Sequence, residues 1–324
     1  YAGLPGWDAA GLPEAEQSEP YIHHFPDGNS TIARKLVCRL IPDLVSGNSL
    51  ENLITAKLDY GLLDDPRNDV SVRLNSTVIN VQNNKSAGGT VTVSYVRDNQ
   101  LEKVSASKCI LACNSNVIPF ICPELPDKQK EALAFQVKVP ILYTNVAVKS
   151  WEAWKNLGIG AMVCPGSYHI VSMLDFPVTY GNYEFSRNER EPIVIHMERF
   201  PHSYGSNLSA REQYKLGRYE LLTTPFETIE RNVREQLESS LSEGGFNAAK
   251  DILGITVNRW SHGYSYWYNP LFDPIYDDYN DSRYPHIIGR KKYGNITIAN
   301  ADSAANAMLE SAIEEAYRAV SELI

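Results

Sequence analysis

The chain has 324 residues, of which 43% are hydrophobic and 21% are charged, and its formal net charge is −9. This is the composition of an ordinary globular protein that is long enough for two domains. The acidic balance argues against a nucleic acid as partner, because phosphate binding needs clustered Lys and Arg, and no apolar run is long enough to span a bilayer.

The first residues, Tyr1-Ala-Gly-Leu-Pro-Gly-Trp7, contain neither an initiator methionine nor a signal-peptide pattern. They suggest a fragment, a processed chain or part of a longer protein. Residues 1–28 are rich in Gly, Pro and acids, which predicts an irregular approach segment. A helix is then predicted to begin at Asn29 or Ser30, which are capping residues, and to end before Pro42.

The next part of the chain predicts a small antiparallel ribbon. A short helix near 50–57 comes first. The following stretches alternate like strands: Val70–Leu74, Val78–Gln82, Thr90–Val96 and Val104–Ala112. The last of them ends in an apolar run, so we expect the ribbon to re-enter a parallel sheet at Cys109–Ala112.

Residues from about 119 to 258 are predicted to form an insert with its own strands and helices. Three prolines at its start mark the change in composition. The predicted helices are Lys128–Phe135 and Pro225–Leu241, and the predicted strands are Ile141–Val148, His169–Leu174, Ile193–Met197 and Ile252–Asn258. The segments on either side of the insert are expected to belong to one cofactor domain.

The closing segment predicts a cradle for a cofactor. A short apolar strand, Ile296–Ala299, leads into a turn of small residues that carries Asp302, and an Ala-rich helix follows from about Ala307. Amides at a helix N-terminus suit an anion, because unpaired N–H groups and the helix dipole both favour negative charge. A plain surface turn is the alternative. No Gly-x-Gly-x-x-Gly occurs, so either the nucleotide-binding fold is different or its first βαβ unit lies before Tyr1.

Five motifs, in this order, resemble a known family. They are His24-Phe-Pro-Asp-Gly-Asn29, Ala112-Cys-Asn114, the stretch Cys122–Leu133, Val257-Asn-Arg-Trp-Ser-His-Gly-Tyr264 and Tyr268-Asn-Pro-Leu-Phe-Asp273. With the order of elements around them, they are similar to the C-terminal part of the flavin-containing amine oxidoreductases. The closest resemblance is to bacterial spermidine dehydrogenase-like FAD/NAD(P)-binding oxidoreductases.

The resemblance implies an α/β fold of two domains. One is an incomplete Rossmann-like FAD-binding domain, and the other is an α+β substrate domain with a mixed sheet. After the approach segment 1–28, residues 29–118 would form part of the FAD-binding domain and residues 119–258 the substrate domain. Residues 259–324 would return to the FAD-binding domain with the terminal strand, turn and helix.

The resemblance also implies which residues contact FAD. Val78 matches a ribbon valine whose backbone meets the adenine, although an ordinary buried strand valine would fit as well. Ala112 and Ala301 are expected at the cofactor. Asp302 is expected on the pyrophosphate or ribitol side, where amine oxidases carry a Gly-Glu pair. Met308 and Leu309 match a helix start whose amides face the flavin pyrimidine, where a positive helix end favours anionic reduced flavin.

Further residues are implied near the flavin and the substrate. Lys138 matches a lysine that holds a water against the flavin N5, and its alternative is a surface lysine on an alternating strand. Trp260 and Gly263 are expected to approach the flavin. His262 and Tyr264 are expected at the reacting amine, with His262 handling the proton. The alternative for this stretch is a packed Trp and a hydrogen-bonded His.

Other polar residues leave their roles open. Asp175, Glu198 and Asp273 can each pair with an amine substrate or be surface acids. The pair His23-His24 is interpreted as solvated loop histidines. The five cysteines are odd in number and lack metal-ligand spacing, so no metal site is expected.

The function implied by the resemblance is FAD-dependent oxidation of an amine, with a polyamine such as spermidine favoured. Hydride would pass to the flavin N5, and the imine would be hydrolysed to an aldehyde. The electron acceptor is open, the missing N-terminal half is a candidate partner chain, and the compartment is periplasm or cytoplasm. The alternatives are an FAD enzyme that acts on a non-amine, a fragment inactive without its other half, and a binding module with an aromatic pocket.

Overall fold

The computed structural model describes residues 25, 27–47, 49–84, 89–176, 179–203 and 205–324. The chain divides into two compact units. Unit 1 is Tyr1–Ser71 with Val178–Glu184, and unit 2 is Val72–Pro177 with Phe185–Ile324. The predicted domain boundaries at 28, 118 and 258 stay predictions. They divide the chain by which part binds FAD or substrate, whereas the two units are defined by compactness. Most of the predicted irregular segment 1–28, with His23 and His24, lies outside the described residues.

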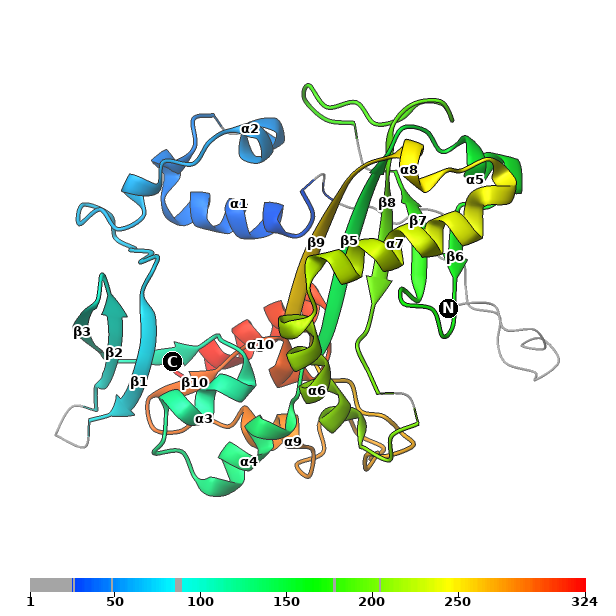
Figure 1. Cartoon of the computed structure of the whole chain (residues 1–324). Coiled ribbons are helices and arrows are strands. Elements are labelled where there is room, and N and C mark those ends of the chain that lie inside the picture. Colours follow the sequence, from blue (N-terminus) through cyan, green and yellow to red (C-terminus); the bar gives the residue numbers. More distant parts are fainter. Residues whose placement is uncertain (1–24, 26, 48, 85–88, 177–178, 204) are drawn as a thin grey trace. The chain divides into compact units, whose positions relative to one another are not determined.

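Unit 1 is built on two short helices (Figure 1). Its elements are α1 (Ser30–Leu40), η2 (Pro42–Leu44), α2 (Leu50–Thr55) and η3 (Tyr60–Leu62). The predicted start at Ser30 and the end before Pro42 are confirmed. The Arg34 guanidinium donates to the carbonyls of Ile54 and Ala56 at 3.3 and 2.9 Å, so α1 satisfies carbonyls at the C-terminal end of α2.

The predicted ribbon is present in unit 2. Its strands are β1 (Thr77–Asn83), β2 (Val91–Arg97) and β3 (Gln100–Ala106), all antiparallel. Asp98 and Asn99 both have positive φ, as a tight hairpin turn requires. The strand predicted at Val70–Leu74 is wrong, because Val70 is in a bend, Leu74 is in a turn and 71–73 have no regular structure. Among the described residues, none of them pairs with a strand.

The predicted parallel sheet is confirmed as a pair of strands. β4 (Cys109–Leu111) pairs in parallel with β10 (Ile296–Ile298), near the end of the chain. The predicted run Val104–Ala112 is therefore broken between β3 and β4. Around the pair lie η4 (Ser115–Val117), α3 (Ile118–Ile121), α4 (Asp127–Phe135) and α9 (Pro285–Gly289). Buried Leu111, Leu133 and Ile298 belong to the apolar core of this region.

A five-stranded sheet forms the other part of unit 2. In the order β6-β7-β8-β5-β9, its strands are β6 (Ala161–Val163), β7 (Val171–Asp175), β8 (Ile193–Arg199), β5 (Val139–Val148) and β9 (Ile252–Tyr264). The prediction of a mixed sheet is wrong here, since every neighbouring pair is antiparallel. Each strand runs against its neighbours, so none needs a parallel crossover.

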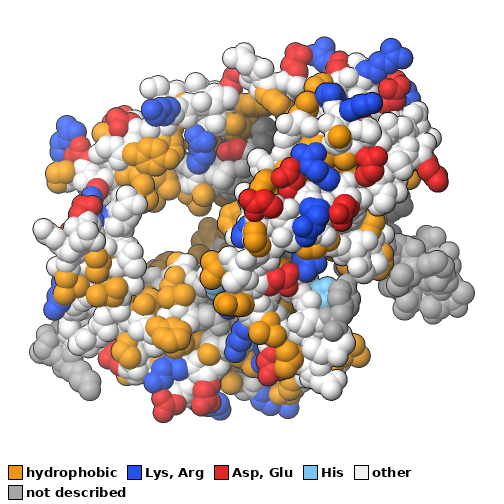
Figure 2. All heavy atoms as spheres, viewed as in Figure 1, with side chains coloured by type: hydrophobic (Ala, Val, Ile, Leu, Met, Phe, Trp, Pro, Cys, Tyr) orange, Lys and Arg blue, Asp and Glu red, His pale blue; other side chains and the backbone are white. Residues whose placement is uncertain are grey.

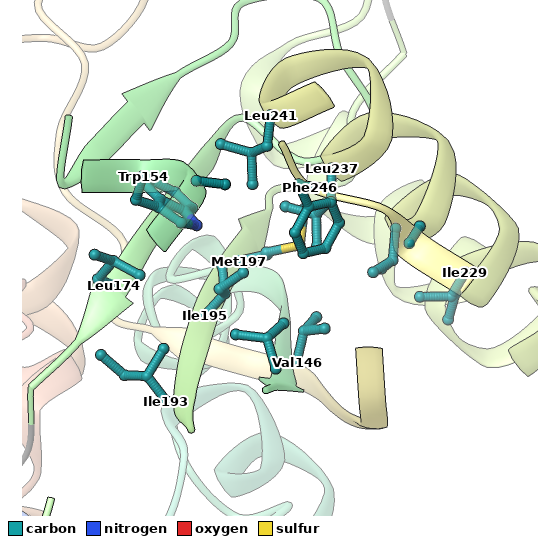
Figure 3. Packing of buried hydrophobic residues seen from close by; sticks show 14 of the residues in the cluster. Val146, Trp154, Leu174, Ile193, Ile195, Met197, Ile229, Leu237, Leu241 and Phe246 are labelled. Atoms are coloured by element: carbon teal, nitrogen blue, oxygen red, sulfur yellow. The ribbon is translucent and has the colours of Figure 1, made fainter. Parts of the chain in front are cut away.

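One face of this sheet is covered by α7 (Phe226–Leu241). Figure 3 shows Ile229, Leu237 and Leu241 of α7 in one apolar cluster with Ile195 and Met197 of β8. Acidic and basic side chains are interspersed on the outer face of α7 (Figure 2). The remaining helices are α5 (Glu152–Leu157), α6 (Ala210–Thr223), η5 (Ser242–Gly244) and α8 (Ala248–Asp251). The helix predicted at Pro225–Leu241 is confirmed, whereas α5, α6 and β6 were not predicted.

The terminal strand, turn and helix are confirmed with a later helix start. After β10, residues Ala301–Ala304 form the short helix η6, and Ala305 has a φ of 47° that ends it. The helix α10 (Leu309–Ser321) therefore begins at Leu309 rather than near Ala307. Among the described residues, no helix is both long and apolar enough to cross a membrane.

Candidate active site

The turn that carries Asp302 lies where two parallel strands end. The amide of Ala299 donates to the carbonyl of Leu111 at 3.1 Å, so the carboxyl ends of β10 and β4 are adjacent. Asn300 caps η6 by accepting from the Ser303 amide at 2.8 Å, and its side-chain amide donates to the Cys113 carbonyl. This edge of a parallel sheet is where α/β folds bind ligands.

Asp302 is the centre of a buried polar cluster, which we call the Lys138–Asp302 cluster. Its Oδ1 lies 2.6 Å from Lys138 Nζ and accepts from Ser265 Oγ at 2.8 Å. Its Oδ2 accepts from the Ser115 amide at 3.0 Å. The Asp302 side chain has no exposed surface, so these partners replace the water that a carboxylate requires. Four segments that are far apart in sequence meet at this one carboxylate.

Lys138 is buried, with 8% of its surface exposed. A buried ammonium needs a partner, and Asp302 supplies it. Ser265 Oγ lies 3.3 Å from the ammonium as well. The backbone is held from the other side, because Arg218 of α6 donates to the carbonyls of Lys138 and Ser261 at 3.0 and 3.1 Å. The surface-lysine alternative is therefore excluded.

Trp260, His262 and Tyr264 alternate along β9 toward the Lys138–Asp302 cluster. Trp260 pairs with Ile141 and Tyr264 with Val139 across the strands. Trp260 is 54% exposed and Tyr264 is 42% exposed. The packed-Trp alternative does not describe this surface, since the indole is open to a ligand.

His262 is poised as a neutral base. Its Nδ1 lies 2.8 Å from Ser261 Oγ. Partial burial lowers the pKa of His262, and the positive charges of Arg218 and Lys138 lower it further, whereas Asp302 acts in the opposite direction. The imidazole is therefore uncharged near neutral pH and able to take up a proton.

A tyrosine pair lies beside the same strand ends. The hydroxyls of Tyr264 and Tyr143 are 2.5 Å apart. Burial raises the pKa of Tyr143, and the contact with Tyr264 raises it further. The Tyr143 phenol is therefore neutral near neutral pH and acts as a hydrogen-bonding group rather than as a base.

The packing of the two strands explains why residue 263 is a glycine. A Cβ at this position would lie 2.6 Å from Ile141 Cγ2 and 3.0 Å from the Val139 carbonyl oxygen. The close packing of β9 on β5 thus requires a glycine here. Its predicted approach to the flavin stays a prediction.

The start of α10 offers free backbone donors. Met308, the N-cap residue, is 50% exposed and its side chain makes no capping hydrogen bond. Leu309 is the first helical residue. Half-buried Ala301 lies in the preceding turn. The helix has 13 residues, and its first-turn amides, which have no hydrogen-bond partner among the described residues, fit a carbonyl or an anionic group.

Two predicted residues lie outside the Lys138–Asp302 cluster. Val78 is 37% exposed on β1, an edge strand of the ribbon. Ala112 is exposed directly after β4. Within the described part of the chain, no hydrogen bond or ion pair joins either residue to Lys138 or Asp302. Their contacts with FAD stay predictions.

Sequence reasoning missed four contributors to the site: Ser115, Tyr143, Arg218 and Ser265. Ser115 and Ser265 directly follow two of the motifs that carry the resemblance, so extending each motif by one residue would have included them. Arg218 lies on α6, a helix that was not predicted.

The three acids proposed for substrate binding differ in their surroundings. Asp273 is buried and accepts from the Tyr266 hydroxyl and the Asn269 amide, which assigns it a structural role. Asp175 is exposed at the end of β7. Glu198 lies on β8 beside His196, 3.2 Å from its Nε2.

Two buried amides in this region have unsatisfied atoms. Both polar atoms of the Gln136 side chain lack a hydrogen-bond partner among the described residues, as does Asn306 Oδ1. Gln136 lines a narrow crevice together with Ser115, Asp302 and Ser303. Asn306 lies in the turn before α10 and donates from Nδ2 to Ser311 Oγ at 2.9 Å. Unpaired buried amides are uncommon and are often completed by a ligand or water.

Neither a protein-family model nor a curated protein matches the sequence. Solved structures do match the fold. A single-residue variant of putrescine oxidase, made in a structure-based redesign of cofactor binding, aligns with a TM-score of 0.50 and 16% identity over 77% of this chain and 48% of that chain. Cyclohexylamine oxidase from Brevibacterium oxydans aligns with a TM-score of 0.50 and 11% identity, over 76% of this chain and 47% of that chain.

At these identities the likeness is one of fold. The chain shares the α/β fold of amine oxidases and spans about half the length of both structures. The fold expected from the motifs is thus supported at the level of the amine oxidases. The closer resemblance to spermidine dehydrogenase stays a prediction.

Proposed function

We propose that this chain is part of an FAD-dependent oxidoreductase that oxidises amines. The observation that carries the proposal is the Lys138–Asp302 cluster. It lies at the carboxyl ends of β4 and β10, in the segment that leads into the uncapped start of α10. The similarity of the fold to that of amine oxidases supports the same proposal.

The residues present fit a flavin nucleotide. The amides at Met308 and Leu309 suit the pyrimidine carbonyl, and the unpaired Oδ1 of Asn306 is a free acceptor in the same turn. Ala301 leaves room for close approach of a ligand to the backbone. FAD, when bound, would supply the hydride acceptor for oxidation of the carbon that bears the amine, and the imine would then be hydrolysed to an aldehyde.

The chain's own side chains would hold the substrate and manage its proton. Neutral His262 accepts the proton of the incoming ammonium group, which leaves a neutral amine. The exposed faces of Trp260 and Tyr264 form an aromatic wall that orients this amine and displaces water. Asp302 and Ser265 fix the ammonium of Lys138, so that its position does not depend on a flexible side chain.

A polyamine such as spermidine is the proposed substrate. An FAD enzyme that acts on a non-amine is the alternative, since a shared fold leaves the chemistry open. A chain that is inactive without its other half is a second alternative, favoured by the coverage of about half of the matched structures.

Reconstitution with FAD tests the proposal. The chain, after incubation with FAD and removal of free cofactor, is expected to keep a flavin absorbance spectrum. Anaerobic spermidine should bleach that spectrum, whereas an alcohol of similar length should not. A colourless protein that stays indifferent to FAD would contradict cofactor binding by this chain, and equal bleaching by the alcohol would contradict the amine.

Two substitutions test the roles of single residues. His262→Asn should lower the rate of bleaching at neutral pH and reduce its pH dependence, because the proton acceptor is lost. Lys138→Met should slow turnover or reoxidation of the bleached protein if the ammonium acts at the flavin. Ser261→Ala removes only the hydroxyl that contacts His262 Nδ1, and it should lower the rate less than His262→Asn does because the imidazole remains.

A further inference from the structure

The face of the five-stranded sheet opposite α7 carries a row of polar and aromatic side chains. Tyr143 and Asn145 of β5 lie on this face, and Glu198 and His196 of β8 are their cross-strand partners. Asn258 of β9 pairs with Tyr143 from the other side. The first four residues are half-buried and Asn258 is exposed. This row contrasts with the mainly apolar face beneath α7, where Thr144 and Ser172 are buried among apolar side chains.

His196 is fixed in this row by its neighbours. Its Nδ1 lies 2.9 Å from Asn145 Oδ1, and its Nε2 lies 3.2 Å from Glu198 Oε1. The Tyr143 ring packs edge-on against the imidazole, with centroids 5.0 Å apart. The carboxylate of Glu198 is therefore held next to an aromatic ring by a chain of defined contacts.

Glu198 differs from three other enclosed acids of unit 2 in its ion pairing. Glu220 pairs with Arg199, Glu315 with two arginines, and Asp302 with Lys138. Within the described part of the chain, no Lys or Arg pairs with Glu198, and its Oε2 accepts no hydrogen bond. Its side chain is 22% exposed. A half-buried carboxylate with a free oxygen and no permanent cation favours a cation from a ligand.

The row continues toward the candidate active site. The Tyr143 hydroxyl contacts Tyr264, and Tyr264 pairs with Val139, the residue after Lys138. Lys138 and Tyr143 are five residues apart, which is roughly 16 Å along an extended strand. A ligand that reaches from Glu198 to the Lys138–Asp302 cluster must therefore be long.

We propose that Glu198, with Tyr143 and His196, forms a binding site for a second positively charged amino group of the substrate, remote from the amine that reacts. The ligand class is a polyamine whose charged groups are separated by flexible methylene chains. Glu198 Oε2 accepts from the ammonium, the Tyr143 ring offers a cation–π contact, and Trp260 and Tyr264 cover the methylenes. The choice of a polyamine rests on the proposed function, whereas the cation site rests on the sheet face.

Equilibrium binding of spermidine to the chain without FAD tests this site directly. Wild type should bind spermidine more tightly than hexylamine, which carries one charge. Glu198→Gln should weaken spermidine binding by about 10- to 100-fold, as expected for loss of a charge-assisted hydrogen bond, and should leave hexylamine binding nearly unchanged. Circular dichroism confirms that the variant is folded.

A matched control distinguishes loss of the Glu198 site from a change in the net charge of the protein. Glu235 is an exposed acid on α7, on the other side of the sheet, and Glu235→Gln removes the same charge. It should leave spermidine binding unchanged. Equal losses for Glu235→Gln and Glu198→Gln, or no loss for Glu198→Gln, would overturn the proposal, as would wild type that binds no spermidine.

Tyr143 provides a second variant, which carries the test if Glu198→Gln does not fold. Tyr143→Phe keeps the ring and should bind spermidine nearly as wild type, whereas Tyr143→Leu should weaken binding severalfold. Equal binding by both variants would contradict a contact with the ring. Spermidine binding that depends on Glu198 in a protein that takes up no FAD would support the site and contradict the proposed function. Spermidine-driven bleaching that Glu198→Gln leaves unchanged would support the proposed function and contradict the Glu198 site.

Discussion

Two clusters of buried charge in unit 2 are built in different ways. The Lys138–Asp302 cluster joins side chains and one amide from four separate segments around a carboxylate with no exposed surface. The second cluster surrounds Glu315 of α10, which pairs with Arg290 at 2.5 Å and Arg318 at 2.9 Å. Glu315 has two cations from the C-terminal segment, whereas Asp302 has one.

The difference indicates which cluster can serve a ligand. Arg318 also pairs with Glu322, the C-cap residue of α10. Glu315, Arg318 and Glu322 thus form a network along this one helix. Such a network stabilises the helix whether or not anything binds. The Lys138–Asp302 cluster instead joins the ends of the sheet strands β5 and β9 to the turn before α10. A ligand bound at that turn would therefore be connected to the substrate face of the sheet through the same ion pair.

Breaking the Lys138–Asp302 pair should have the largest effect on stability. Lys138→Met leaves the Asp302 carboxylate buried without its cation, and Asp302→Asn leaves the ammonium unpaired. Each is expected to lower the free energy of unfolding by about 3–5 kcal/mol, measured by urea denaturation followed by circular dichroism. The double variant Lys138→Met with Asp302→Asn should cost less than the sum, because neither charge remains. Additive costs would contradict the pairing.

Acid should lower the free energy of unfolding through His286, which lies near the Glu315 cluster. Burial and the nearby Arg290 lower the pKa of His286 to about 4, and the Tyr268 hydroxyl lies 3.0 Å from its Nδ1. The unfolded state binds this proton near the ordinary pKa of about 6.5, so stability is complete above that pH and is lost as the pH falls toward 4. The expected loss is about 2–3 kcal/mol.

The measurement is urea denaturation at pH 7 and at pH 4.5. His286→Gln should show a smaller loss between the two pH values than wild type, whatever its stability at pH 7. His202→Gln, which replaces a histidine outside this cluster, is the control and should keep the pH dependence of wild type. An identical pH dependence in His286→Gln and wild type would assign the acid sensitivity to other groups.

The sequence predicted the elements whose pattern is local. Alternation located β1 and β2, and the apolar run Cys109–Ala112 located the parallel strand β4. It failed for Val70–Leu74, where alternation has no partner strand. It also missed α6, although Ser209 and Glu212 form a capping box at its start.

The candidate site was predictable residue by residue but not as an arrangement. Lys138 was predicted because it matches a lysine of the family that the motifs resemble, and Asp302 because it lies in a small-residue turn. Their ion pair was not predicted, since alternation tells which face a side chain occupies and not what it meets there. Ser115 takes part through its backbone amide, which no side-chain pattern reveals.

Arg290 should matter less than Lys138, because Arg318 remains to pair with Glu315. Arg290→Met is expected to lower the free energy of unfolding by about 1–3 kcal/mol, measured as above. Part of this loss arises at η6, where the guanidinium donates to the Ser303 carbonyl at 3.2 Å. Arg290→Lys keeps the charge and should recover part of the loss. A cost equal to that of Lys138→Met would remove the distinction between the two clusters.

The smallest expected change in the free energy of unfolding is at Gln136. Comparing this change with and without FAD tests whether Gln136 contacts the cofactor. The side chain is 1% exposed and neither amide atom has a partner among the described residues. Gln136→Met removes the unpaired amide at similar volume and should raise the free energy of unfolding by about 1 kcal/mol in the absence of FAD. If the amide hydrogen-bonds to bound FAD, saturating cofactor should stabilise wild type more than the variant. An equal shift of the melting temperature in both proteins would exclude Gln136 from the cofactor site and leave the crevice as a packing defect of the fold.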